Sequence, residues 1–250
     1  MTLTGRLHRL TNRMLNPLGV KLIADVNRRK PWDAVFRQWV QRAKLNGSDP
    51  NDIGDSEWSD DRLMPALDKR YMRHITADSV VLELGPGTGR LTRHIIGHCK
   101  TLICVDYSQM VCDWLHAHFR DVSCLTVHHV TTPSLPMIGD RSIDVIVAHG
   151  VFEHINLPDL SFFLEECYRT LQPSGVMSFN YDNIMTRAGI EWLKEFRGTP
   201  GEQCIFHFYH PDTMVWLAKN VGFAVLHNSV DEGRLCHIEL QKPPDTGHAA

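Results

Sequence analysis

From residue 80 onward, short apolar runs alternate with amphipathic stretches along the chain. The predicted strands are 80–84, 101–106, 123–130, 142–150, 175–181, 224–230 and 234–242, and the predicted helices are 90–98, 108–119, 157–171 and 210–223. Such alternation predicts an α/β fold with a doubly wound, mostly parallel, seven-stranded sheet. Only "DEGR" separates the last two runs, so we expect an antiparallel hairpin there.

The pattern before residue 76 is different. Amphipathic helical faces recur at about 7–18, 31–44 and 60–75, and the polar stretch between the last two reads as a loop. We therefore expect 1–75 to be an N-terminal helical extension that acts as an acceptor lid. The α/β domain would span 76–243 with an insert at 180–210, and 244–250 would be a flexible tail.

Composition narrows the class of protein. The 250 residues are 43% apolar with a formal net charge of −3, which gives no general reason to expect a polyanionic partner. The seven cysteines are odd in number and form no C-x-x-C, as expected for reduced thiols in the cytoplasm. No apolar run approaches the length of a membrane span, and no signal peptide is apparent.

Basic residues are concentrated at the N-terminus, where residues 1–46 hold ten Lys/Arg against Asp25 and Asp33. Three interpretations stay open: a solvated helix face, peripheral contact with an anionic membrane surface, or contact with nucleic-acid phosphates. Arginines between leucines favour the membrane over nucleic acid.

A glycine loop follows the first predicted strand, in "VLELGPGTGR" (81–90). Gly85, Gly87 and Gly89 let the backbone approach a ligand closely and adopt positive φ. Asp106 ends the second strand, 21 residues after Gly85, where a carboxylate can accept hydrogen bonds from both hydroxyls of a ribose. The ligand is therefore expected to contain a nucleoside.

The charge of the loop selects among nucleoside ligands. A dinucleotide fingerprint would need glycine where Arg90 stands, and no Walker G-K-[ST] is present. Glu83 at the mouth of the loop would repel a pyrophosphate but would suit a ligand with an ammonium and a sulfonium. S-adenosylmethionine has both groups, a ribose and no phosphate, so it is the predicted cofactor.

These motifs, with "DVIVAHGVFEHI" and "LQPSG", resemble the class I S-adenosylmethionine-dependent methyltransferases, which have a Rossmann-like fold, over about residues 78–241. The resemblance implies that the loop and Glu83 surround the methionine part and that Asp106 holds the ribose. The other implied cofactor contacts are Tyr107 and Met110 near the adenine and His149 and Gly150 beside the sulfonium. An Asp-Ala-like pair after the third strand is replaced by Val130, Thr131 and Thr132, so Thr131 is expected to substitute.

The reaction implied is methyl transfer. If the acceptor is a hydroxyl, a base should take its proton, and the candidates are His149, His154 and His207. "NRMLNPLGVKL" and "DPNDIGD" are similar to the N-terminal ends of bacterial methyltransferases linked to surface polysaccharide. We therefore expect O-methylation of a glycan, glycolipid-type or other small-molecule acceptor on the cytoplasmic side of the membrane. A nucleic-acid methyltransferase, transfer to another small metabolite and a non-enzymatic module remain alternatives. No ligand spacing indicates a metal.

Overall fold

The computed structural model describes residues 32–50, 67–195, 206–229 and 233–245. The helix predicted at 7–18 and most of the basic N-terminal segment lie outside these described residues. Among the helices that the structure describes, none has the length and hydrophobicity needed to cross a bilayer.

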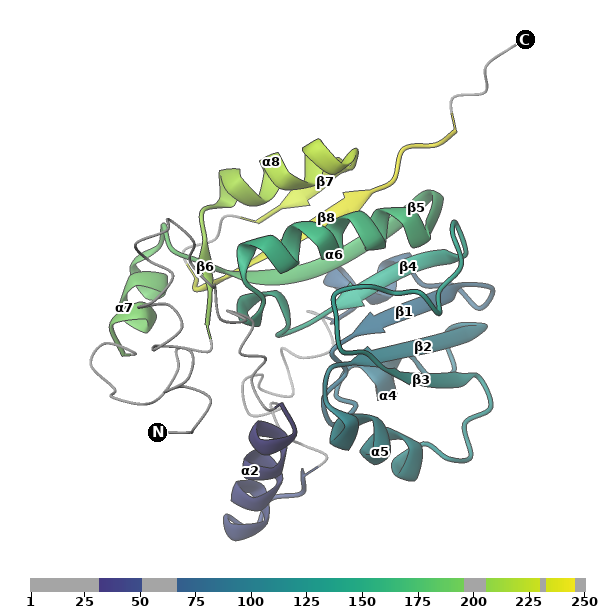
Figure 1. The fold of residues 1–250 in the computed structure, drawn as a ribbon, viewed down its shortest axis with the longest axis vertical. Helices are drawn as coiled ribbons and strands as arrows, with labels where there is room; N and C mark the ends of the chain where they lie inside the picture. Colours follow the sequence, from purple (N-terminus) through teal and green to yellow (C-terminus); the bar gives the residue numbers. More distant parts are fainter. Residues whose placement is uncertain (1–31, 51–66, 196–205, 230–232, 246–250) are drawn as a thin grey trace, which may run out of the picture. The chain divides into compact units, whose positions relative to one another are not determined.

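One sheet organises the described part of the chain (Figure 1). Its strand order is β3-β2-β1-β4-β5-β8-β7, with β6 paired to the end of β5. The strands are β1 (Val80–Leu84), β2 (Thr101–Asp106), β3 (Leu125–His129), β4 (Ile143–Ala148), β5 (Leu171–Asn183), β6 (Phe208–Tyr209), β7 (Ala224–Asn228) and β8 (Leu235–Gln241). Among the described strands, β8 pairs antiparallel with β5 and β7, which confirms the predicted fold class and the predicted hairpin. The sheet has eight strands rather than the predicted seven, because β6 adds to the end of β5.

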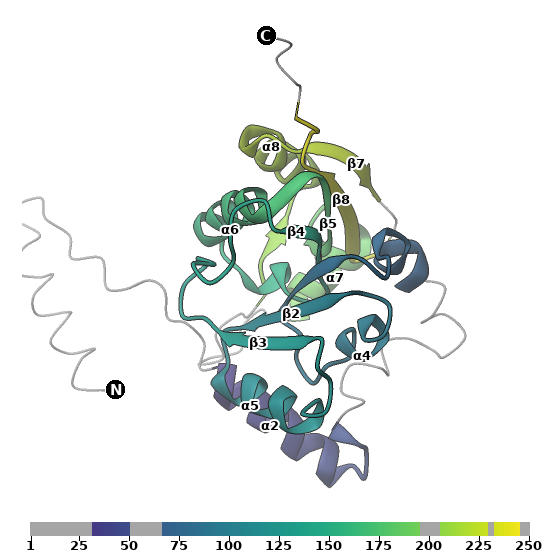
Figure 2. The same cartoon turned by 90° about the vertical axis from the view of Figure 1, so that its right-hand side faces the viewer.

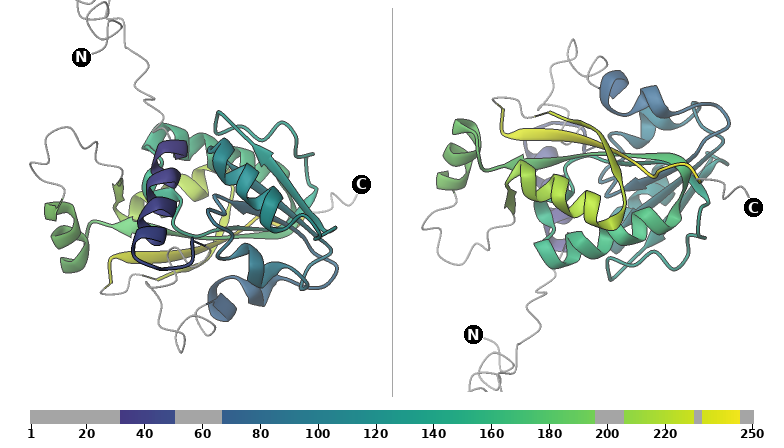
Figure 3. Two further views of the ribbon diagram at one scale, coloured as in Figure 1. Left: turned by 90° about the horizontal axis from the view of Figure 1, so that it is seen from below. Right: turned by 90° about the horizontal axis from the view of Figure 1, so that it is seen from above.

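Helices cover both faces of the sheet. They are α2 (Trp32–Leu45), α4 (Thr92–Ile95), α5 (Gln109–His118), α6 (Leu157–Thr170), α7 (Arg187–Glu195) and α8 (Pro211–Val221), with the 3-10 turns η4 (Met72–His74) and η5 (Phe152–His154). The pair α6 and α8 packs on one face, whereas α4 and α5 lie on the other with α2 alongside α5 (Figures 2 and 3). Each face buries its own apolar cluster, as the continuous apolar strands predict.

Local signals explain where several helices begin and end. Ser108 caps α5, as expected, by accepting a hydrogen bond from Val111 N at 3.2 Å. Asn156 caps α6 in the same way through Asp159 N. The helix α8 ends at Gly222, which has a φ of +116°.

Four elements differ from the prediction. The strand β5 begins at Leu171, earlier than expected, because a register shift between Leu171 and Val176 accommodates "QPSG" within the strand. The helix α4 has four residues, shorter than the predicted 90–98. Both α7 and the short β6 lie in the insert, for which no elements were predicted.

Candidate active site

The predicted cofactor residues gather at the carboxyl ends of β1, β2 and β4. The strand β1 lies between β2 and β4. The chain adds β2 and β3 on one side of β1 and then places β4 and the later strands on its other side, so the strand order reverses at β1. Ligands of open parallel sheets bind at such a switch point, beyond the carboxyl ends of the strands. The glycine loop, the segment after β2 and the segment after β4 all meet there.

The three loop glycines all have positive φ: +63° at Gly85, +58° at Gly87 and +91° at Gly89. A Cβ on Gly85 would lie 2.6 Å from Val151, and one on Gly89 would lie 2.6 Å from Phe119. At Gly87 a Cβ would meet nothing within 4 Å. The outer two glycines therefore serve packing, whereas the middle one leaves open space beside the backbone, as a ligand cradle requires.

Glu83 lies behind the loop rather than in open space. Its carboxyl is 2% exposed, and its Oε2 accepts hydrogen bonds from Thr92 Oγ1 at 2.7 Å and from Cys104 Sγ at 3.5 Å. Burial raises the pKa of this carboxyl to about 7. Contact between Glu83 and the ammonium of a methyl donor stays a prediction.

Asp106 stands at the end of β2, as the sequence predicts. Its Oδ1 accepts a hydrogen bond from Ser108 N at 2.7 Å, and burial raises the pKa of the carboxyl to about 7. Val130 N donates to the Asp106 carbonyl at 2.9 Å, so the segment after β3 begins beside this acid. The next residue, Thr131, is exposed there. Its role as a substitute adenine contact remains a prediction.

The two predicted adenine neighbours lie on different elements. The Tyr107 ring meets Phe163 of α6 edge-on, with the centroids 6.1 Å apart. Met110 is in the first turn of α5, where its backbone N donates to Asp33 of α2 at 3.1 Å. The contact with α2 is a long-range one that the sequence pattern does not signal.

The end of β4 carries His149 and Gly150. The hydroxyl of the fully buried Tyr71 lies 2.9 Å from His149 Nδ1. Burial lowers the pKa of His149 well below its usual value, and the nearby Arg90 and Arg70 act in the same direction. Gly150, with a φ of +71°, donates its N–H to Asn180 Oδ1 at 2.9 Å. A neutral, oriented imidazole therefore stands at the strand end.

The other two candidate bases have different surroundings. The His154 ring lies between Trp32 at 5.0 Å and Phe206 at 4.8 Å, measured between ring centroids. His207 is held through its backbone, which donates to the Glu153 carbonyl at 2.6 Å. The contacts of His154 are those of a packing residue that connects α2 to the insert.

Polar side chains missed by the sequence prediction line the end of β5. Asp182 is fully buried and pairs with Arg234 at 3.3 Å. The Arg234 guanidinium lies 4.6 Å from the centroid of the Trp192 ring, which itself meets Phe206 edge-on. Buried polar residues on one strand face are an unusual composition for a core. The polar composition of "SFNYDN" was therefore the sequence feature that could have indicated these side chains.

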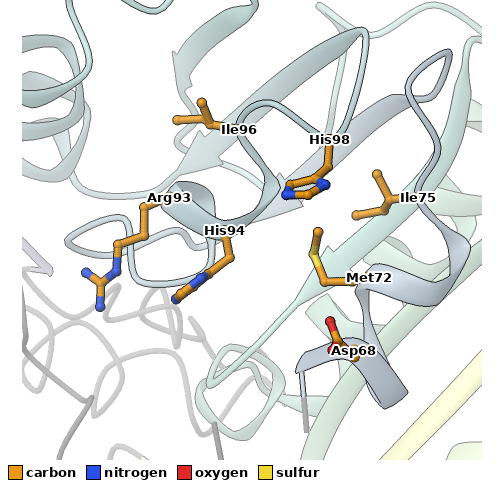
Figure 4. Close-up of a pocket in the computed structure, with 7 residues that line it drawn as sticks. All are labelled: Asp68, Met72, Ile75, Arg93, His94, Ile96 and His98. Carbon is orange, nitrogen blue, oxygen red and sulfur yellow. The ribbon is translucent and has the colours of Figure 1, made fainter. Parts of the chain in front are cut away.

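A separate cavity of about 270 Å³ lies between the segment before β1 and α4 (Figure 4). It is lined by Asp68, Met72, Ile75, Arg93, His94, Ile96 and His98. None of the predicted cofactor or catalytic residues lines it. Within the described ranges, no group of three or more His, Cys, Asp or Glu side chains is arranged to hold a metal ion.

Comparison with known proteins relates the central part of this chain to a family of enzymes. Residues 82–179 match the methyltransferase domain family model. An uncharacterized methyltransferase-like protein of Schizosaccharomyces pombe is 30% identical over 49% of this chain and 42% of its own length. A probable S-adenosylmethionine-dependent methyltransferase of Mycolicibacterium smegmatis is 32% identical over 46% of this chain and 42% of its own length. The matched segments thus span less than half of these relatives.

Solved structures share the fold. The complex of the Haloferax volcanii Trm112 methyltransferase activator with its methyltransferase aligns with a TM-score of 0.63 at 16% identity, over 83% of this chain and 97% of that one. An S-adenosylmethionine-dependent methyltransferase of Mesorhizobium loti aligns with a TM-score of 0.58 at 14% identity, over 71% and 96% of the two chains. At these identities the likeness concerns the fold alone.

The residues present suit the cofactor that this family uses. Gly87 leaves open space beside a left-handed backbone, and Asp106 offers a carboxylate at the neighbouring strand end. S-adenosylmethionine is therefore the cofactor implied for this domain, with the glycine loop and Asp106 as the residues that would hold it. The chain carries a class I S-adenosylmethionine-dependent methyltransferase domain.

Proposed function

We propose that the protein transfers a methyl group from S-adenosylmethionine to a hydroxyl of a sugar, glycan or glycolipid-type acceptor. The supporting observation is a pair of buried amides at the end of β5. Asn180 and Asn183 are 1% and 0% exposed, and in the described part of the chain neither Nδ2 has a hydrogen-bond partner. A buried donor left unpaired costs about 1–3 kcal/mol. Positions 180 and 183 lie on opposite faces of the strand, and an acceptor rich in oxygen atoms would satisfy the amide on the face where it binds.

Aromatic surface near Asp182, which stands between these two asparagines in β5, supports the same class of acceptor. Trp192 and Phe206 lie 5.6 Å apart between ring centroids, and Arg234 covers Trp192 while it pairs with Asp182. Apolar rings with a few convergent polar groups are typical of small-molecule sites. The combination suits a ligand with one apolar face and several hydroxyls.

The chemistry assigned to the chain is proton removal and positioning. When bound, S-adenosylmethionine supplies an electrophilic methyl group on a sulfonium. A hydroxyl acceptor must lose its proton as the new bond forms, so a base contributes. His149 is the preferred candidate because burial keeps its imidazole neutral. A base at Nε2 requires the proton on Nδ1, which would then donate to the Tyr71 oxygen.

His154 and His207 stay alternative bases, although the ring contacts of His154 favour a packing role. In either case the protein would hold the acceptor oxygen about 3–3.5 Å from the methyl carbon, and this positioning supplies much of the acceleration.

The test is transfer of labelled methyl groups from S-adenosylmethionine by the purified full chain. The acceptor panel would hold sugar nucleotides, oligosaccharides, lipid-linked oligosaccharides in anionic vesicles, RNA and small amines or thiols. We expect label in the carbohydrate acceptors, in a base-stable ether linkage. Lipid-linked acceptors also test the predicted membrane contact of the basic N-terminus. Transfer only to RNA, or only to a small amine or thiol, would overturn the proposal.

A further inference from the structure

The first turn of α2 contacts segments on both sides of the predicted cofactor site. The Trp32 ring lies 5.0 Å from the His154 ring, which follows β4. Its neighbour Asp33 reaches the beginning of α5, which follows β2. Because β4 and β2 are the two neighbours of β1, these two residues of α2 touch the segments on either side of the glycine loop.

The Asp33 carboxylate is attached through one oxygen. Oδ1 accepts hydrogen bonds from Ser108 Oγ at 2.6 Å and from Met110 N at 3.1 Å. Within the described part of the chain, the side-chain hydrogen bonds of this half-buried residue both fall on Oδ1, so Oδ2 keeps its lone pairs for a ligand. The two bonds lower the pKa of Asp33, so it is ionised at neutral pH.

Ser108 joins this carboxylate to the predicted ribose acid. Its backbone N donates to Asp106 Oδ1 at 2.7 Å while its side chain donates to Asp33 Oδ1 at 2.6 Å. The two carboxylates are therefore neighbours across one residue, and the charge of Asp33 contributes to the raised pKa of Asp106. Two ionised carboxylates side by side repel each other, and this costs free energy unless hydrogen-bond donors are supplied to them.

We propose that Asp33 is a second residue that binds the methyl donor. It accepts a hydrogen bond from one ribose hydroxyl of the cofactor, while Asp106 accepts one from the other. A vicinal diol presents two O–H donors at neighbouring positions, which matches two neighbouring carboxylates. The helix α2 then closes over the adenosine by direct contact with the ligand. The inference rests on the cofactor and is independent of the proposed acceptor.

The variant Asp33→Asn tests this role. Asparagine keeps an Oδ1 that can accept from Ser108 and Met110, so α2 stays attached, but it replaces the charged Oδ2 with an amide. Binding of S-adenosylhomocysteine and of its 2′-deoxy and 3′-deoxy analogues would be measured by calorimetry at pH 8.5. At that pH Asp106, with a pKa of about 7, is ionised. We expect Asp33→Asn to weaken S-adenosylhomocysteine binding about tenfold and to have under twofold effect on one of the two deoxy analogues.

Asp113→Asn is the matched control, because Asp113 is an exposed acid on α5 that bonds Gln109. It changes the net charge equally and should leave all three affinities within twofold. An equal loss of affinity for all three ligands, or no loss with S-adenosylhomocysteine, would overturn the proposed ribose contact. Asp33 would then serve only to attach α2 to α5. If the unaltered protein bound none of the ligands, the cofactor assignment itself would fail. No acceptor is present, so neither result depends on the glycan proposal.

Discussion

Asp106 is the residue on which we expect recognition of the methyl donor to depend most directly. It ends a strand at the switch point of the sheet, and its carboxylate is already oriented by Ser108 N. Hydrogen bonds to a charged group contribute roughly 1.5–3 kcal/mol each. Because Asp33 lies next to it, part of the ribose contact would survive the loss of one acid.

We predict that Asp106→Ala weakens the binding of S-adenosylmethionine by about 10–100-fold, because one or two charged hydrogen bonds are lost. Isothermal calorimetry at pH 8 measures the change. Asp113→Ala, on the exposed side of α5, is the control and should bind normally. Unchanged affinity in Asp106→Ala would contradict the placement of the ribose.

Glu83 makes stability depend on pH. In the folded apoprotein its pKa is about 7, above the unfolded value of roughly 4.3. Between these values the folded state holds a proton that the unfolded state has released, so the free energy of unfolding falls as pH rises towards 7. We predict that Glu83→Gln is more stable than the unaltered protein by about 1–3 kcal/mol at pH 8, and equally stable near pH 4.

Urea unfolding of the apoprotein at the two pH values checks this prediction. Glutamine can still accept hydrogen bonds from Thr92 and Cys104, so packing is preserved and charge is the main change. If Glu83→Gln were destabilised at pH 8, the carboxylate would be stabilised in the native state and its pKa would not be raised.

At the scale of elements, the glycine loop combines two requirements within five residues. Gly89 packs its backbone against Phe119, whereas Gly87 faces open space. We predict that Gly89→Ala lowers the free energy of unfolding by about 2–4 kcal/mol, because the new Cβ meets both a positive φ and an aromatic ring. Gly87→Ala should cost only about 1–2 kcal/mol, from the φ alone.

The same two variants should also differ in their affinity for the methyl donor, but in the opposite order. In Gly87→Ala the new methyl group would stand where we expect the ligand. Gly87→Ala should therefore lose more affinity than Gly89→Ala when both proteins are folded. Thermal unfolding and calorimetry at 15 °C give the two measurements. Equal effects of both substitutions on stability and on binding would show that the loop does not divide its roles in this way.

The elements of the insert explain why the acceptor is harder to identify than the donor. The match to the methyltransferase family model ends at residue 179, immediately before Asn180. The polar end of β5, together with α7 and β6, lies beyond it. The residues proposed to bind the acceptor are therefore those for which the family comparison offers no counterpart.

At the scale of the whole molecule, donor binding should be coupled to protons. Glu83 and Asp106 both have a pKa of about 7. A ligand with an ammonium and two hydroxyls favours their ionised forms, so binding lowers both pKa values and releases protons near pH 7. We predict that affinity for S-adenosylhomocysteine rises from pH 6 to pH 8 and then levels.

Calorimetry at pH 7 in two buffers of different ionisation enthalpy gives the number of protons released. Each group is about half protonated at this pH, so we expect a release between about 0.5 and 1 from the two groups. In Asp106→Ala the release should fall, and at pH 9 it should vanish for these groups. Proton uptake at pH 7, or affinity that falls over this range, would contradict the coupling.

The sequence by itself determined the alternation of strands and helices outside the insert, the parallel sheet with its final hairpin, and the positions of the glycine loop and Asp106. These depend on local periodicity and turn chemistry, which a short window records. Only the tertiary structure brought Tyr71 to His149, 78 positions away, and Asp33 to Ser108, 75 positions away. Such contacts arise where separate helices pack over one strand end, and no local pattern of hydrophobicity specifies which side chains meet there.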